Sequence, residues 1–158
     1  MPTITSDTPS TDSFTDQEMA AWRGMLQTHA QVTQALDAQM RAEHGLSVSS
    51  YEVLMFIGAA EGRRLRMSEI ADRVLLSRSG LTRLVDRLVE LGYLTRCASE
   101  NDGRGLYAQL TDAGAAQLEA ARRTHREGVR MFFLDHLRTT DEIVLGDVWT
   151  RFLAATRR

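Results

Sequence analysis

The sequence has 158 residues, 43% of them hydrophobic, which suffices for one domain with its own core but is short for two independent domains. It contains only two prolines and few aromatic residues, a composition that favours helix over sheet. The formal net charge of −2 gives the whole chain no attraction to nucleic acid, so such contact would require charge gathered on one surface. The single cysteine, Cys97, excludes an internal disulfide framework and a multi-cysteine zinc site, and it fits a reducing cytoplasm.

Residues 1–15 are rich in Ser, Thr, Asp and Pro and are expected to form a flexible tail. They have neither the basic start nor the apolar run of a secretion signal. No later segment has the roughly 18 apolar residues that a membrane span needs. We therefore expect a cytoplasmic protein that does not contact membranes, with residues 16–158 folded as a single domain.

The first predicted helix covers residues 16–44. One line of its positions recurs at alternating steps of three and four, the heptad seam of a helix that pairs with another helix: Met19, Trp22, Leu26, His29, Thr33, Leu36 and Met40. Gly45 is expected to end this helix, and Ser47 or Ser49 to cap a second one. The second helix has the apolar stripe Val48, Tyr51, Leu54 and Met55.

The next segment, residues 58–111, completes a small lobe. A loop, a short extended piece and a compact helix from Ser68 to about Val74 precede a fourth helix, which Ser77 caps and Gly92 ends. Two strand-like stretches, 93–97 and 106–110, then flank the turn-rich segment ASENDGRG. A hairpin directly after two helices joined by a tight turn predicts a winged helix-turn-helix lobe over residues 47–111.

Two further helices are predicted after the hairpin. Thr111 caps a long helix to about Leu137, and Thr140 or Asp141 begins the last one. One stripe of the long helix carries Leu118, Ala121, His125, Val129, Phe132 and His136. The fold class is mainly α, a winged helix-turn-helix lobe with a two-stranded β wing between long N- and C-terminal dimerisation helices, residues 16–44 and 112–157.

The terminal helices predict a homodimer, because their apolar seams have no place inside so small a lobe. The residues expected at the interface, or in the core that supports it, are Met19, Leu26, Phe132, Phe133, Leu137, Trp149 and Phe152. An obligate pair of this kind buries more than ~2,000 Å².

The fourth helix has two unlike faces. Leu81, Leu84, Val85, Leu88 and Leu91 form the face expected to pack on the lobe, and the opposite face carries Arg78, Ser79, Thr82, Arg83, Asp86 and Arg87. Seven arginines and three carboxylates between Arg63 and Arg87 give this stretch a net charge of +4. Such a helix fits the major groove of duplex DNA. The alternative is a solvated polar face on which Arg83 and Arg87 pair with Asp86 and Glu90.

The run SRSGLTRLVDRLVELGYLTR, followed by DGRGLYAQLTDAG, resembles the recognition helix and wing of the MarR family. The resemblance extends from about Asp16 over nearly the whole chain. One difference is that Gly103 and Gly105 flank Arg104, where many members have a second Arg and a Ser. The resemblance implies a sequence-specific regulator that binds double-stranded DNA at a near-palindromic operator and represses transcription until a small aromatic or phenolic ligand releases it.

Site residues follow from the motif and the resemblance together. Arg104, between two glycines at the hairpin tip, is expected to enter an adjacent minor groove, and the resemblance implies that Asp102 orients it. The DNA-binding residues are then Ser77, Arg78, Ser79, Thr82, Arg83, Arg87, Asp102 and Arg104. The resemblance also implies an effector cleft between the dimerisation helices and the lobe, with Trp22, Arg23, His29, Tyr51 and His125 as candidates. Trp22 and His29 could equally belong to a dimer core.

Other classes of function have little support in the sequence. It lacks a glycine-rich phosphate loop, HExxH and GxSxG, so we expect no enzyme and no cofactor. The four histidines lack the local ligand spacing of a metal site, and we expect no metal. Two alternatives to a ligand-released repressor remain, namely a winged-helix dimer that docks another protein and a redox-responsive regulator that uses Cys97.

Overall fold

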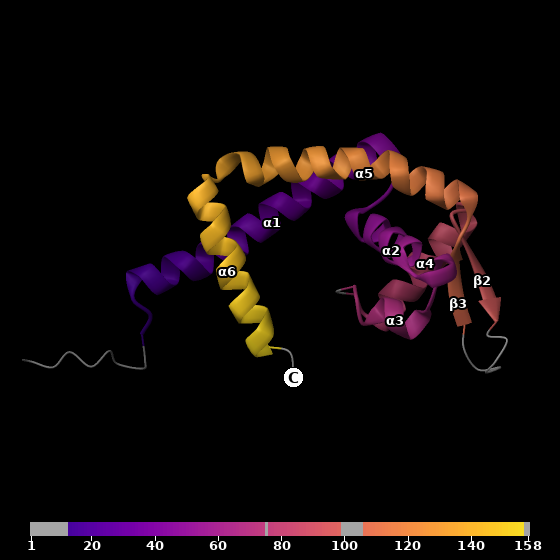
Figure 1. Ribbon diagram of the computed structural model, residues 1–158, viewed down its shortest axis with the longest axis horizontal. Helices are drawn as coiled ribbons and strands as arrows, with labels where there is room; N and C mark the ends of the chain where they lie inside the picture. The colour runs from indigo at the N-terminus through magenta and orange to yellow at the C-terminus, as the bar shows by residue number, and fades with distance from the viewer. Residues whose placement is uncertain (1–12, 75, 99–105, 157–158) are drawn as a thin grey trace, which may run out of the picture.

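A computed structural model describes residues 13–74, 76–98 and 106–156. The described chain is mostly helical, as predicted, with one small sheet (Figure 1). Its elements are α1 (Asp16–His44), α2 (Val48–Ala59), the one-turn 3₁₀ helix η1 (Glu61–Arg63), β1 (Arg64–Arg66), α3 (Met67–Ala71), α4 (Arg78–Glu90), β2 (Leu94–Ala98), β3 (Leu106–Leu110), α5 (Asp112–Phe132), the 3₁₀ helix η2 (Leu134–His136) and α6 (Thr139–Thr156).

Short polar side chains begin four of the helices. The hydroxyls of Ser47, Ser77 and Thr111 accept hydrogen bonds from backbone N–H groups in the first turns of α2, α4 and α5, which satisfies donors that have no partner inside the helix. Thr15 forms a reciprocal capping box with Glu18 at the start of α1. Gly45 ends α1 with a φ of 66°, as its predicted role requires.

The predicted two-stranded hairpin is present as β2 and β3, and β1 joins it as a third strand whose pairing the sequence did not predict, so the strand order is β1-β3-β2. Both pairings are antiparallel; Leu65 faces Ala108, and Arg96 faces Ala108 from the other side. β1 is only three residues long and has one buried side chain, Leu65. A strand this short gives almost no alternation pattern, and its partner lies about forty residues further along the chain.

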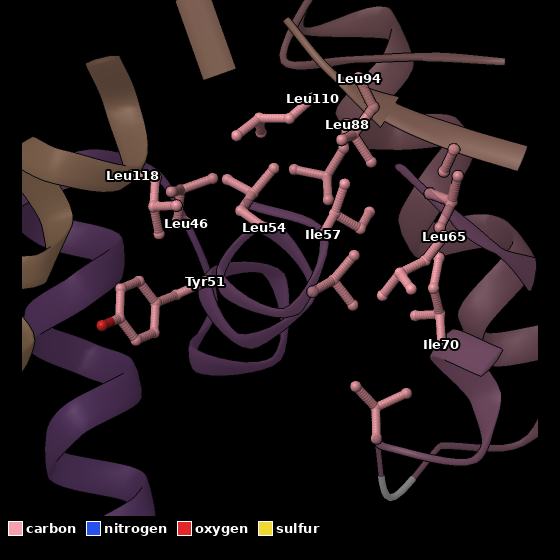
Figure 2. Close-up of a cluster of buried hydrophobic side chains, with 14 of the residues drawn as sticks. Leu46, Tyr51, Leu54, Ile57, Leu65, Ile70, Leu88, Leu94, Leu110 and Leu118 are labelled. Carbon is pink, nitrogen blue, oxygen red and sulfur yellow. The ribbon is translucent and has the colours of Figure 1, made fainter. Parts of the chain in front are cut away.

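Helix α2 lies at the centre of the lobe core. Its buried side chains Leu54 and Ile57 contact those from the helices and the sheet around it, as Figure 2 shows. Leu88 of α4, Leu94 of β2 and Leu118 of α5 close this core. Burial of one such side chain contributes roughly 1.5–3 kcal/mol, so the core holds α4 against the lobe by Leu81, Val85 and Leu88 of the predicted face. Leu91, which the sequence placed on the same face, follows the end of α4 and is 39% exposed.

Helix α5 joins the lobe to α1, along which it packs (Figure 1). The two helices approach closely at Gly128, where an added Cβ would lie 2.7 Å from Leu36 Cδ2. A hydrogen-bonded chain lies near this crossing. Thr124 Oγ1 donates to Glu43 at 2.9 Å and lies 2.8 Å from His44 Nε2. Because the hydroxyl proton goes to Glu43, Nε2 of His44 is the donor in the second bond.

The predicted end of the long helix at Leu137 is wrong. α5 ends at Phe132, and Phe133 has non-helical backbone angles, φ −135° and ψ −63°. α6 begins at Thr139, just before the predicted Thr140 or Asp141. Asp141, in the first turn, accepts a hydrogen bond from the backbone N–H of Arg138 at 3.0 Å. His136 therefore lies in η2 and does not continue the α5 stripe of His125.

Only part of the α1 seam is buried within the chain. Leu36 and Met40 are buried against the lobe and α5, whereas Trp22 and Leu26 are 55% and 47% exposed. Figure 1 shows the N-terminal half of α1 extending away from the lobe. In the described parts of the chain, none of the helices is both long and apolar enough to cross a bilayer.

Candidate nucleic-acid interface

Helix α4 presents a polar face to solvent. Leu81, Val85 and Leu88 are buried, and the helix spacing places a set of exposed side chains on the opposite side: Arg78, Ser79, Thr82, Arg83 and Arg87. Ser77 is exposed, but its hydroxyl already accepts the Gly80 N–H at 3.1 Å. Its role in this structure is to begin the helix, which leaves the first turn in place for a ligand to approach.

The polar side chains of this face differ in the contacts that they already make. Thr82 Oγ1 donates to the carbonyl of Arg78 at 3.0 Å, and an Arg87 nitrogen lies 3.5 Å from Glu90. Arg83 makes no hydrogen bond or ion pair with any other residue that the structure describes. Its guanidinium is therefore free, among these residues, to make the two-pronged contacts that suit guanine.

Asp86 has a different partner from the one weighed in the sequence analysis. Its Oδ1 accepts a hydrogen bond at 2.6 Å from Arg96, on β2. Sequence reasoning missed Arg96 because the two residues are ten positions apart. Strand alternation was the available signal, because it places Arg96 on the same side of β2 as buried Leu94, the side that packs on α4.

The two predicted wing residues, Asp102 and Arg104, lie outside the described residues. The strands before and after them are described, and they pair through Ala98 and Leu106. The hairpin architecture predicted around this segment is thus present, and the roles of Asp102 and Arg104 remain predictions.

The candidate effector residues fall into two groups. The rings of Tyr51 and His125 stack, with centroids 4.5 Å apart, and burial raises the pKa of Tyr51 and lowers that of His125. Trp22, Arg23 and His29 are exposed on the N-terminal half of α1. Within one chain, therefore, only two of the five candidate effector residues, Tyr51 and His125, lie together.

Two hollows on the described surface bear on where a small ligand could bind. A 380 Å³ pocket adjoins His125 and is lined also by Arg126, Arg130 and Leu134. A larger one of 820 Å³ lies between η1, β1, α3 and β3 and includes none of the five candidate effector residues. No group of three His, Cys, Asp or Glu side chains within the described ranges could hold a metal ion.

The seven residues expected at a dimer interface keep much of their apolar surface exposed. Leu26 is 47% exposed, Trp149 39% and Phe152 58%. Met19, Phe132, Phe133 and Leu137 are partly buried. α6 also exposes Ile143, Val144 and Leu153, so a broad apolar surface on the terminal helices has no partner among the residues that the structure describes.

The fold and the exposed α4 define a winged helix-turn-helix protein, and comparison with known proteins identifies its family. A MarR family model matches residues 44–105. The chain is 31% identical to AbsC, a MarR family transcriptional regulator from Streptomyces coelicolor; the match covers 93% of this chain and 99% of AbsC, with a TM-score of 0.85. The chain belongs to the MarR family.

Two other relatives extend this comparison. Sco3205, a MarR family transcriptional regulator from the same organism, was crystallised with DNA; it is 27% identical, with a TM-score of 0.87 over 95% of this chain and 94% of Sco3205. The transcriptional regulator PrsX of Escherichia coli is 29% identical over 67% of this chain. That match spans 54% of PrsX, so the chain corresponds to about half the length of this curated relative.

Proposed function

We propose that this protein is a sequence-specific regulator of transcription that binds duplex DNA through α4 and the wing. The observation that carries the proposal is the exposed, cation-bearing face of α4, opposite the buried apolar face by which this helix packs on the lobe. The crystal complex of Sco3205 with DNA supports it, because that relative shares the fold over nearly the whole chain.

The chemistry of the α4 face suits the major groove. The groove admits a helix, and an arginine can donate two hydrogen bonds to O6 and N7 of guanine. Arg83, Thr82 and Ser79 lie early on α4, where a recognition helix contacts base edges. Arg78 and Arg87 suit the phosphates. Arg104, oriented by Asp102, would enter the adjacent minor groove from the wing.

A two-fold dimer is part of the same proposal. The unpartnered apolar surfaces of α1 and α6 would be buried against a second copy, and two α4 helices would then read a near-palindrome with half-sites about one helical turn, ~10 bp, apart. A dimer bound over a promoter excludes other proteins from it, so we propose repression as the outcome.

Release by a small aromatic or phenolic acid completes the proposal. The rings of Tyr51 of α2 and His125 of α5 stack beside a 380 Å³ pocket, which falls within the usual size of small-molecule sites. Arg126 and Arg130 line this pocket together with one carboxylate, Glu127. Trp22, Arg23 and His29 would join this site only where a dimer brings α1 to it. A ligand releases DNA only through contacts that differ between the two lobe spacings.

A salt titration of DNA binding tests the central claim. The promoter fragment that the protein retains from its own genome would be titrated at several salt concentrations. Displacement of counterions from several phosphates predicts a steep linear fall of log affinity with log salt. Docking of a protein through a mixed-charge face requires no such slope, so retention of no fragment, or a flat dependence, contradicts the proposal.

A further inference from the structure

One ion pair ties the recognition helix to the wing sheet. Arg96 of β2 donates to Asp86 of α4 over 2.6 Å, and the two side chains are 29% and 53% exposed. Most other exposed pairs that involve α4, α5 or α6 join residues three or four positions apart; among the described residues the exception is Asp112 of α5, which lies 3.9 Å from Arg63 of η1. The Asp86–Arg96 pair joins two elements whose relative placement decides where the polar face of α4 points.

The backbone between these two elements is a tight turn. Tyr93 N–H donates to the Leu88 carbonyl at 2.9 Å, and Gly92 has a φ of 76°, which few other residues adopt without strain. Leu88 and Leu94 are buried on either side of the turn. The ion pair joins α4 and β2 on the solvent side of this turn, and the buried leucines join them on the core side.

The charges of the pair matter for the polar face as well. Asp86 is the only carboxylate among the exposed side chains of α4 that flank Arg83 and Arg87 over residues 78–87. An unpaired carboxylate there would repel phosphates, at a cost that grows as water is excluded. Arg96 neutralises it from the sheet and leaves Arg83 unpaired by any described residue.

We propose that Asp86 and Arg96 form a positioning pair, which fixes α4 relative to the wing sheet and keeps the carboxylate of the recognition face neutralised when DNA binds. The proposal rests on the DNA-binding function proposed above. It predicts that the two residues act as a unit, and that Arg96 contributes to DNA affinity through Asp86 and not as an independent cation.

A double-mutant cycle on DNA affinity tests this coupling. Arg96→Met keeps the aliphatic stem and removes the charge. An exposed ion pair contributes little free energy, but a dimer on one operator loses that contribution in both lobes. We therefore expect the affinity for DNA to fall on the order of five-fold. Adding Asp86→Asn to Arg96→Met should restore part of that loss, because the uncompensated carboxylate is removed.

The matched control is Arg123→Met. Arg123 pairs with Glu127 at 2.8 Å on α5, away from α4, so this variant has the same change in net charge and also breaks an exposed ion pair. It should bind DNA within two-fold of the parent. Two outcomes would show that Arg96 acts independently and would overturn the proposal. In one, Arg96→Met loses the same affinity whether or not Asp86→Asn is present; in the other, Asp86→Asn alone binds DNA more tightly than the parent.

A second measurement needs no DNA, which separates failure of this proposal from failure of the proposed function. Cys97 is the single cysteine and follows Arg96 on β2, and its partly buried thiol lies 3.6 Å from Gln109 Oε1. Its reaction rate with a thiol reagent under native conditions therefore reports opening of the sheet.

Coupling predicts the direction in which this rate changes. Loosening of β2 should speed the reaction, because the thiol of Cys97 becomes accessible more often. We expect Arg96→Met and Asp86→Asn each to accelerate labelling about two- to five-fold, and the double variant to be no faster than either. A slower rate for Arg96→Met, or multiplicative effects in the double variant, would refute the coupling.

Discussion

At the residue scale, Arg83 is the side chain that we most expect to recognise a base pair of the operator. Its side chain is exposed on α4 and unpaired among the described residues. Arg83→Ala should weaken operator binding by ~1–3 kcal/mol and relax the preference at one base pair, if the guanidinium reads a guanine. Affinities for single-base operator variants measure both effects.

The comparison for Arg83 is Arg104→Ala in the wing. Loss of a minor-groove and phosphate contact should weaken binding with less change in the preferred sequence, and the dependence on salt should become shallower. If both variants bind every operator variant as the parent does, α4 and the wing are not the reading surface.

His125 makes a prediction about pH. Burial lowers its pKa below the ordinary value of 6.5, so the unfolded chain binds the proton more readily. The stabilising contribution of the neutral ring is present above pH 6.5 and is lost as the pH falls toward the lowered value. Between pH 7.5 and 5.5, urea unfolding should show a smaller loss of stability for His125→Gln than for the parent.

The control for this effect is His136→Gln, in the exposed turn η2. It should lose as much stability as the parent over the same range. Should His125→Gln match the parent as well, burial of this imidazole does not contribute to the acid sensitivity.

At the element scale, the start of α5 depends on a close approach to the β2 side of the lobe. A Cβ on Gly114 would lie 2.1 Å from the Tyr93 carbonyl oxygen and 2.8 Å from Leu110 Cδ1. Because backbone must move to relieve this, Gly114→Ala should destabilise the protein by at least about 2 kcal/mol in denaturant unfolding.

Gly24→Ala is the matched substitution in α1, where an added Cβ meets nothing within 4 Å. Alanine is the better helix former, so this variant should gain up to ~1 kcal/mol. A Gly114→Ala protein as stable as the parent would mean that α5 does not pack on Tyr93 in this way.

At the scale of the whole molecule, the terminal helices predict an obligate dimer. Trp149, Phe152 and Leu26 leave apolar surface that no described part of the chain covers, and an interface of more than ~2,000 Å² would bury it. Sedimentation at micromolar concentration should give twice the 17.7 kDa chain mass. A folded monomer at that concentration is the contrary outcome.

The dimer in turn sets the shape of the footprint. Two lobes related by a two-fold axis should protect a near-palindrome with half-sites ~10 bp apart. Footprinting on the retained promoter fragment measures this spacing, and protection of one asymmetric half-site would contradict it.

Local sequence determined much of this protein. The caps Ser77 and Thr111, the stop at Gly45 and the buried face of α4 were predictable, because each depends on residues within one or two helical turns. The family motifs were predictable for the same reason, since the recognition helix and the wing are contiguous in the chain.

Only the tertiary structure decided which distant residues meet. β1 pairs with β3 across about forty positions, and Asp86 pairs with Arg96 where the alternative weighed from the sequence had paired it on its own helix. Tyr51 stacks on His125, while Trp22 remains exposed. The end of α5 at Phe132, where Phe133 takes non-helical backbone angles, was likewise not visible in the periodicity of the sequence. Periodicity reports which face of an element is buried, but the partner that buries it is set by packing in three dimensions.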